Sequence, residues 1–329
     1  MATYKDIRGT NVKTVSSDPP APVNGQVWYN STTQVMKGFT ESPAGSWATG
    51  GNLNTGRAYL GSAGTSQTAS LAFGGYDTPP ATRRALNESY NGTSWTELAD
   101  LNTARNDLAS GGTSTSALGF GGYQSTTLDI TESWNGSSWT EVADLNTGRT
   151  QFAGCGADNE ACLGFGGYPN YAITETWNGT SWTEVGDLNQ ARSSLTGAGT
   201  NTAALAISGE NSSPTATDYA NVELWNGSAW TEIADVNDAR DGMAASKYGT
   251  STSAIAFGGP ASSPITGKTE LWNGTSWSEQ NDASVARYSS GGSGTSSNAL
   301  KFGGGDPTKT TSTEEFTAPT TSTVTFTTS

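Results

Sequence analysis

The hydrophobic positions of this chain fall in short runs separated by stretches of glycine, serine and threonine. The run 69–75 is apolar and ends in paired glycines. Later runs end in the same way, at Gly121-Gly122, Gly166-Gly167, Gly258-Gly259 and Gly303-Gly304, whereas one copy has Ser208-Gly209. Short apolar runs that end at turn residues are typical of buried β-strands.

Three further positions repeat in register with these runs. An arginine and then a strand of small residues precede each run, with steps of 43–48 residues between arginines: Arg57, Arg105, Arg149, Arg192, Arg240 and Arg287. A glutamate follows after a variable loop: Glu88, Glu132, Glu175, Glu223, Glu270 and Glu314. A tryptophan then opens the last strand: Trp95, Trp139, Trp182, Trp230 and Trp277. A fixed period of this length predicts stacked copies of one supersecondary unit.

The turns and the small residues indicate how one copy folds. Asn135-Gly136 lies between Trp134 and Trp139, and Asn-Gly dipeptides recur at the same place in the other copies. Because Asn-Gly accepts positive φ at both central positions, it closes a tight hairpin. The small-residue strand after each arginine suits a position near a central axis, where backbones approach closely. The tryptophans are expected to fill the wider space between copies.

The order arginine, apolar strand ending in Gly-Gly, Glu-x-aromatic and tryptophan is similar to the kelch repeat. The similarity extends over residues 47–316. That family builds β-propellers with one four-stranded blade per repeat. The resemblance therefore implies an all-β fold, a six-bladed kelch-type β-propeller at residues 45–317.

Closure of the ring is expected from the two ends of the repeat region. Six small-residue strands are followed by only five complete tryptophan strands, and Trp47 precedes Arg57 at the spacing of Trp95 from Arg105. We therefore predict that the strand around Trp47 completes the last blade by pairing with residues 312–316. Joining the first and last segments in one blade removes an exposed edge.

Residues 1–44 do not fit the repeat and are expected to form an N-terminal arm. The stretch 25–39 predicts a small β-hairpin. Its Gly-x-Val-Trp-Tyr-Asn-Ser phrase resembles a hairpin found near the N-terminus of bacteriophage tail and other virion proteins. An ordinary strap lying on the propeller is the alternative. The Thr/Ser-rich tail 318–329 suits an edge strand, a strand bound to a partner or a frayed end.

Composition and charge narrow the function. The net charge of −14 disfavours nucleic acid and anionic membranes as partners. No apolar run is long enough for a transmembrane helix, and residues 1–10 lack the pattern of a signal peptide. More than half of the acidic residues occupy repeated positions, so we expect the repeat arginines and glutamates to pair within or between blades as scaffold.

Catalytic and metal chemistry find little support in the residue types. The chain has no histidine, which removes the usual nucleophile triads and most zinc and copper sites. We therefore expect no metal, no cofactor and no enzyme. Cys155 and Cys162 flank the expected turn of the third blade, so a disulfide between them and two buried thiols both remain open.

The remaining candidate chemistry lies in the variable loops, where recognition on a rigid scaffold usually occurs. Tyrosines follow the paired glycines in the first three copies, with amides nearby. Aromatic faces and amides suit a carbohydrate, although packing of the blade tops is the alternative. The candidate ligand-binding residues are Tyr76, Tyr123, Gln124, Tyr168, Asn170 and Tyr171.

These features together predict a non-enzymatic structural or host-recognition protein of a bacteriophage virion, associated with the tail or a fibre. In this hypothesis residues 1–44 bind other virion proteins, the propeller binds a host surface glycan or protein, and the chain is a homo-oligomer in the particle. The first alternative is a cellular or secreted lectin-like kelch module, extracellular or cytoplasmic. The second is a propeller glycoside hydrolase.

Overall fold

The computed structural model describes residues 12–20, 22, 25–41, 44–77, 82–211, 217–259, 265–306 and 308–326. The described chain is all-β and contains no helix, so no helix in it could span a membrane. It divides into a large unit, Ser46–Ala318, and a small unit that joins residues up to Gly45 with residues from Pro319 onward.

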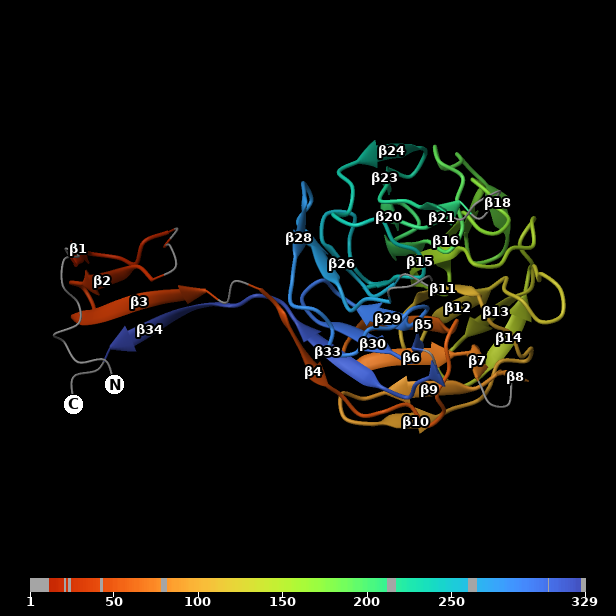
Figure 1. Cartoon of the computed structure of the whole chain (residues 1–329), viewed down its shortest axis with the longest axis horizontal. Coiled ribbons are helices and arrows are strands. Elements are labelled where there is room, and N and C mark those ends of the chain that lie inside the picture. Colours follow the sequence, from red (N-terminus) through yellow and green to blue (C-terminus); the bar gives the residue numbers. More distant parts are fainter. Residues whose placement is uncertain are drawn as a thin grey trace. The chain divides into compact units, whose positions relative to one another are not determined.

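The described part of the large unit contains six four-stranded antiparallel sheets, an architecture consistent with a β-propeller (Figure 1). The first three sheets are β5(Gly61–Ser66), β6(Ala69–Phe73), β9(Asn87–Tyr90) and β10(Trp95–Glu97); β11(Ala109–Gly112), β12(Ala117–Phe120), β13(Thr131–Trp134) and β14(Trp139–Val142); and β15(Ala153–Asp158), β16(Ala161–Phe165), β17(Thr174–Trp177) and β18(Trp182–Glu184). The other three are β19(Thr196–Gly199), β20(Ala204–Ile207), β23(Val222–Trp225) and β24(Trp230–Ile233); β25(Ala244–Ala245), β26(Ala254–Phe257), β27(Thr269–Trp272) and β28(Trp277–Glu279); and β29(Gly291–Gly294), β30(Ala299–Phe302), β33(Thr313–Thr317) and β4(Ser46–Thr49).

Among the described residues, three two-stranded hairpins extend the loops between second and third strands. They are β7(Tyr76–Asp77) with β8(Thr82–Arg83), β21(Glu210–Asn211) with β22(Thr217–Asp218), and β31(Gly305–Asp306) with β32(Thr308–Lys309). Each begins directly after the paired small residues that follow the second strand. These hairpins carry several of the side chains discussed below.

The predicted Asn-Gly turns close the outer hairpins of the sheets. Trp134 pairs with Trp139 across the β13–β14 turn, and Gly136 has a φ of 92°. The Asn135 side-chain oxygen accepts hydrogen bonds from the backbone N–H groups of Ser137 and Ser138, each at 3.0 Å. The Asn135 side chain thus accepts the backbone N–H groups of the turn that it begins, as Asn does in Asx-turns.

The small-residue strands meet one another near the middle of the large unit, as predicted. In sequence order β5, β11, β15, β19, β25 and β29 each contact the next, and β29 contacts β5 (Figure 1). A Cβ atom built on Gly111 would lie 2.7 Å from a backbone carbon of Cys155, and one on Gly292 would lie 2.4 Å from the Ala245 carbonyl oxygen. Side chains at these positions would force neighbouring sheets apart.

The paired glycines also join neighbouring sheets. Gly75 N–H donates to the carbonyl of Arg105 in the next repeat at 2.8 Å, and Gly304 N–H in the last repeat donates to the carbonyl of Arg57 in the first at 2.9 Å. Gly75 has a φ of 102°, which side chains rarely permit. The Gly-Gly signature is therefore a backbone contact between sheets.

Aromatic rings fill the space between sheets, as the sequence predicts. Trp139 packs on Phe73 of the preceding sheet at 4.7 Å between ring centroids, and Trp182 packs on Phe120 in the same way. The Trp182 Nε1–H also donates to Thr131 Oγ1 of that preceding sheet at 3.0 Å. Each tryptophan therefore fastens its own sheet to the one before it.

The strand around Trp47 pairs with the end of the repeat region. Trp47 of β4 lies opposite Phe316 of β33, so residues from both ends of the large unit share one sheet. The Trp47 ring packs edge-on against Phe257 of the neighbouring sheet at 5.0 Å, and its Nε1–H donates to Thr269 Oγ1. Trp47 thus makes the contacts that the other outer tryptophans make.

The small unit is a four-stranded sheet in the order β1(Lys13–Val15), β2(Val27–Asn30), β3(Val35–Glu41) and β34(Thr321–Phe326). β2 and β3 form the predicted hairpin, and β34 is an edge strand antiparallel to β3. Asp18 accepts hydrogen bonds from Trp28, Asn30 and Lys37. These bonds, led by that from Lys37, lower the pKa of Asp18 to about 2.

The two cysteines are free and buried, so the disulfide alternative is wrong for this structure. Cys155 lies opposite Leu163, whereas Cys162 lies opposite Gly156. The one-residue offset places the two side chains on opposite faces of the sheet, where each joins a different hydrophobic cluster. Burial raises the pKa of the Cys155 thiol to about 12. Burial also raises the pKa of the Cys162 thiol well above its ordinary value.

Candidate functional site

Buried ion pairs hold each repeat together within its own sheet. Every repeat arginine binds the glutamate of the third strand of the same sheet: Arg57–Glu88, Arg105–Glu132, Arg149–Glu175, Arg192–Glu223, Arg240–Glu270 and Arg287–Glu314. The prediction that these residues pair is therefore confirmed, with both partners in one repeat.

The pairs are surrounded by further hydrogen bonds. Arg105 also donates to the Gly119 carbonyl on the second strand at 3.2 Å, and Glu132 accepts from the backbone and side-chain nitrogens of Asn102 at 2.7 and 2.8 Å. The charged groups of the repeat thus tie the incoming linker to the second and third strands. Because both charged groups of each pair are buried and bound to one another, they belong to the scaffold and are closed to a substrate.

A cycle of backbone hydrogen bonds runs around the inner end of the sheets. Its members lie two residues after the repeat arginines, and we call them the collar: Tyr59, Asp107, Gln151, Ser194, Gly242 and Ser289. Each backbone N–H donates to the carbonyl of the preceding collar residue, and Tyr59 donates to Ser289, at 2.8–3.2 Å. All six have φ between 48° and 57°, a left-handed conformation that residues other than glycine seldom adopt.

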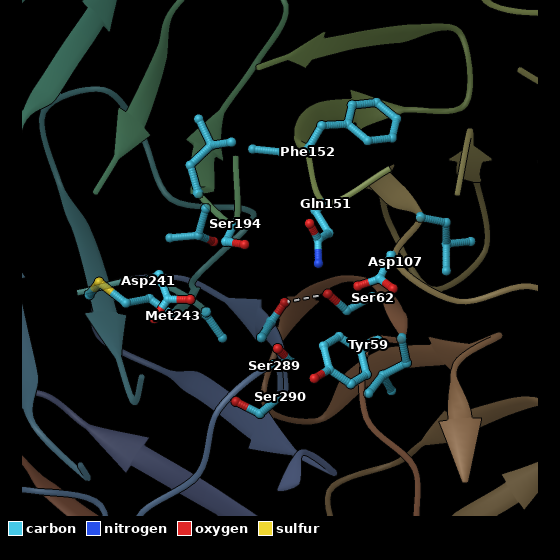
Figure 2. A pocket seen from close by; sticks show the side chains of 18 of the residues that line it. Tyr59, Ser62, Asp107, Gln151, Phe152, Ser194, Asp241, Met243, Ser289 and Ser290 are labelled. Carbon is cyan, nitrogen blue, oxygen red and sulfur yellow. Dashed lines mark hydrogen bonds between the residues drawn. The ribbon is translucent and has the colours of Figure 1, made fainter. Parts of the chain in front are cut away.

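The collar surrounds a cavity of about 160 Å³ (Figure 2). A cavity of roughly 150 Å³ accommodates one six-membered ring. The collar side chains line its mouth, Phe152 and Met243 add apolar surface, and Ser62 and Thr196 lie on the strands below. Every one of the six repeats therefore contributes to one polar cavity.

Asp107 is the collar residue with the most unusual electrostatics. Loss of hydration raises the pKa of its carboxyl to about 7, although the cations Arg83 and Lys309 act in the opposite direction. Lys309 Nζ lies 5.0 Å from the ring centroid of Tyr59 and 5.1 Å from that of Tyr288. One side of the mouth therefore combines tyrosine faces with cations.

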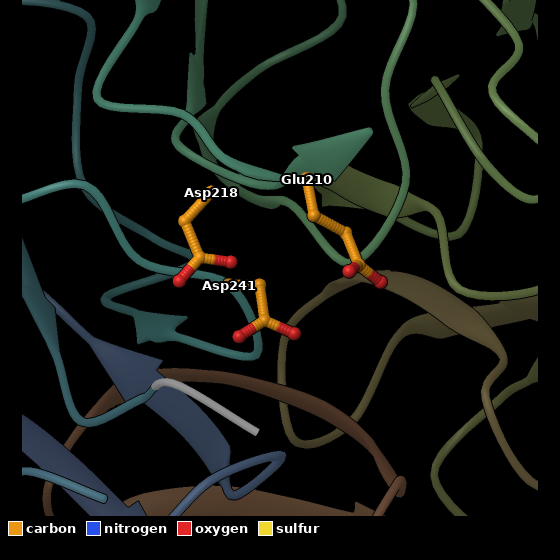
Figure 3. Close-up of side chains that lie close together, drawn as sticks. All are labelled: Glu210, Asp218 and Asp241. Atoms are coloured by element: carbon orange, nitrogen blue, oxygen red, sulfur yellow. The ribbon is translucent and has the colours of Figure 1, made fainter. Parts of the chain in front are cut away.

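Three carboxylates lie close together next to the cavity, and those of Glu210 and Asp241 line it (Figure 3). Glu210, Asp218 and Asp241 each have a carboxylate oxygen within 4.8 Å of the others, a group that could hold a metal ion. Glu210 and Asp218 lie directly opposite one another in the β21–β22 hairpin, where like charges repel. Burial and neighbouring acids raise the pKa of both carboxyls, and a Ser194 hydroxyl bound to Glu210 at 3.0 Å counteracts part of the shift.

The predicted ligand-binding residues lie beside the cavity rather than in its lining. Tyr76, Tyr123 and Tyr168 form backbone bridges to Ala58, Asn106 and Thr150, the neighbours of three collar residues. The Arg83 guanidinium lies 4.8 Å from the Tyr123 ring centroid and 6.0 Å from that of Tyr76. Two of the three tyrosines thus share one cation.

The remaining candidates lie farther along the same loops. Tyr168 is 49% exposed and Gln124 is exposed, whereas Tyr171 is half-buried. Asn170 donates from Nδ2 to the Asn211 side-chain oxygen of the next repeat at 2.7 Å. None of the six predicted residues lines the cavity, so their role in binding stays a prediction.

Sequence reasoning missed the collar, although a signal for it exists. The residue two positions after each repeat arginine is polar or glycine in all six copies and differs in every copy except two serines. A position with a fixed backbone role and varied side chains is what a binding surface on a repeat scaffold requires.

A scan against models of known protein families and a search of curated protein sequences find no match for this chain.

Proposed function

We propose that the large unit is a closed, six-bladed β-propeller of the kelch type that recognises one residue of a surface glycan in its axial cavity. The collar hydrogen bonds, the cyclic contacts of the inner strands and the β4–β33 pairing support the blade count and closure. The observation that carries the binding role is the cavity itself, because it fits a single ring and presents hydroxyl, amide and carboxyl groups beside aromatic faces.

In this proposal the protein is a non-enzymatic host-recognition component of a bacteriophage particle, associated with the tail or a fibre. The small unit binds other virion proteins, and the rims of the propeller face the host. Support for the particle comes from the resemblance of the 25–39 hairpin, whose strands β2 and β3 form the middle of the small sheet. A lectin-like cellular module would have the same cavity without such an anchor.

Two experiments test this proposal. Wild-type protein on a glycan array is expected to bind, and the collar variants Gln151→Gly and Ser289→Gly are expected to bind less. The small-unit variant Lys37→Gln is the matched control and should bind as wild type does. Mass spectrometry of purified phage particles should detect the chain. No binding to any glycan would refute the recognition role, and absence from particles would refute the virion role.

The carboxylate group favours a glycoside hydrolase as a second candidate. Retaining glycosidases place two carboxyl groups roughly 5–5.5 Å apart and raise the pKa of one of them. Glu210 and Asp241 line the cavity, and the pKa of Glu210 is raised. A single-ring cavity does not hold residues on both sides of a scissile bond, so we prefer binding. Release of nitrophenol from aryl glycosides by wild type but not by Glu210→Gln would reverse that preference.

A further inference from the structure

The fifth repeat contains two more residues directly after its innermost strand than the second, fourth and sixth repeats do. Ala117 follows Arg105 by the same number of residues that separates Ala204 from Arg192, whereas Ala254 follows Arg240 by two more. The sequence Gly-Thr-Ser-Thr-Ser-Ala occurs at 112–117 and again at 249–254, which identifies Lys247 and Tyr248 as the insertion. The insertion interrupts the inner strand, so β25 spans only Ala244–Ala245. The neighbouring fourth and sixth repeats have no such insertion.

Lys247 extends from this insertion toward the opposite sheets. Its Nζ donates to Ser110 Oγ on β11 and to the Gly154 carbonyl on β15, both at 3.3 Å. Lys247 also lines the cavity, and Ser110 donates in turn to the carbonyl of Ser62 in the cavity wall. A side chain from the fifth repeat thus places its charge against the second and third.

The ammonium group of Lys247 has only neutral partners. No carboxylate of the described residues forms an ion pair with it. Loss of hydration lowers the pKa of Lys247 to about 8, and the neighbouring Cys155 and Cys162 thiols offset only part of this shift. A partly dehydrated cation with no counter-ion is costly unless an anion completes the site.

We infer that the axial cavity selects an acidic sugar, a uronic acid residue whose carboxylate binds the Lys247 ammonium while its hydroxyls meet the collar. This inference rests on the proposed glycan-binding function and specifies its ligand. Carboxylate–ammonium hydrogen bonds are roughly twice as strong as neutral ones, so the pair supplies discrimination that hydroxyls alone do not. Ligand binding would explain why the fifth repeat has two inserted residues, because the other sheets form without them.

The clustered carboxylates come from other repeats than the groups that the Lys247 ammonium contacts. Glu210 and Asp218 belong to the fourth repeat and Asp241 to the beginning of the fifth, whereas Lys247 Nζ reaches the second and third sheets. Asp107 is flanked by Arg83 and Lys309. The acidic residues still repel an anion at longer range, so neutralising Asp241 should strengthen uronide binding.

Calorimetric titration of the whole chain with methyl glucuronide and methyl galacturonide, against the matching neutral glucoside and galactoside, tests the inference. At pH 6.5 wild type should bind a uronide roughly tenfold or more tightly than its neutral counterpart. Lys247→Met and deletion of residues 247–248 should abolish that preference, and Lys247→Arg should retain part of it. The exposed Lys268→Met is the control and should behave as wild type does.

The pH dependence provides a second measurement. Lys247 loses its proton near pH 8 and Asp107 gains charge near pH 7, so uronide affinity should fall as the pH rises above about 7. Glu210, whose pKa is also raised, adds negative charge when it ionises and so acts in the same direction. In the deletion variant the decline attributable to Lys247 should disappear.

The outcomes separate the two proposals. Equal affinity for uronide and neutral glycoside, or a preference that survives in folded Lys247→Met, overturns the inference and leaves glycan binding intact. Failure of wild type to bind either kind of sugar overturns both. The deletion variant restores the spacing found in the second, fourth and sixth repeats, so it provides an independent test if Lys247→Met does not fold.

Discussion

At the outer strands the repeats carry nearly the same side chains, whereas at the collar they share a backbone conformation and differ in side chains. The tryptophans, the Asn-Gly turns and the arginine–glutamate pairs recur because each contacts a neighbouring strand or sheet that is itself repeated. Collar residues meet their neighbours through backbone atoms, so their side chains were free to diverge. Repetition therefore marks the scaffold, and divergence at a fixed backbone position marks the candidate site.

The largest effect is expected where a scaffold charge loses its partner. Arg105→Met leaves Glu132 buried without its counter-ion, which should destabilise the protein by about 3–5 kcal/mol. Lys268→Met removes a cation from an exposed pair with Asp238 and should cost about 1 kcal/mol or less. Urea unfolding of both variants measures the contrast, and equal losses would contradict the scaffold role of the buried pairs.

A comparable loss is expected from an outer tryptophan. Trp182→Ala removes the ring that packs on Phe120 and should cost about 3–5 kcal/mol. Trp182→Phe retains an aromatic ring but removes the hydrogen bond to Thr131, so its cost should be smaller. Thermal and urea unfolding distinguish the two variants. A loss as large for phenylalanine as for alanine would assign the stability to the hydrogen bond instead of the packing.

Among the collar residues, Asp107 should have the largest effect on how the free energy of unfolding depends on pH. The unfolded carboxyl ionises near pH 4, whereas the folded one holds its proton until about pH 7. The folded state therefore binds the extra proton between these values, and stability should fall as the pH rises from 4 to 7. Asp107→Asn should reduce that decline. Urea midpoints at pH 5 and pH 8 for both proteins measure it, and parallel curves would show that Asp107 does not titrate near 7.

The smallest effect on stability is expected from collar side chains without charge. Gln151→Gly replaces one collar residue by the residue that the fifth repeat has naturally, Gly242, at a similar positive φ. Glycine adopts this conformation without strain, so stability should change by about 1 kcal/mol or less. Glycan binding should nevertheless weaken. A large loss of stability would show that the side chain is part of the scaffold after all.

The sequence predicts much of the fold because the repeated contacts leave repeated residues. The Asn-Gly turns, the small inner strands and the pairing of Trp47 with the last strand could all be inferred from spacing. The relative offset of Cys155 and Cys162 could not, because an irregularity in the β15–β16 register depends on local geometry. A symmetrical placement around a turn does not specify which residues face each other.

The cavity was hidden from the sequence for a different reason. The residues that line it are separated by whole repeats, and they come together through the cycle of backbone hydrogen bonds and the contacts between the inner strands. The tyrosines after the paired glycines are more conspicuous, yet they flank the mouth. The two-residue insertion at Lys247 could have been found by aligning the copies. That the Lys247 side chain reaches the second and third sheets could be seen only in the structure.

The pairing of β4 with β33 has a consequence for biosynthesis. β4 is synthesised before the other strands of the large unit, whereas its partner strand β33, which ends at Thr317, is synthesised last among them. At about 5–20 residues per second, β4 waits roughly ten seconds or longer for that partner. Until then β4 must resist aggregation without its partner, and because Trp47 is its single large hydrophobic residue, it exposes little apolar surface meanwhile.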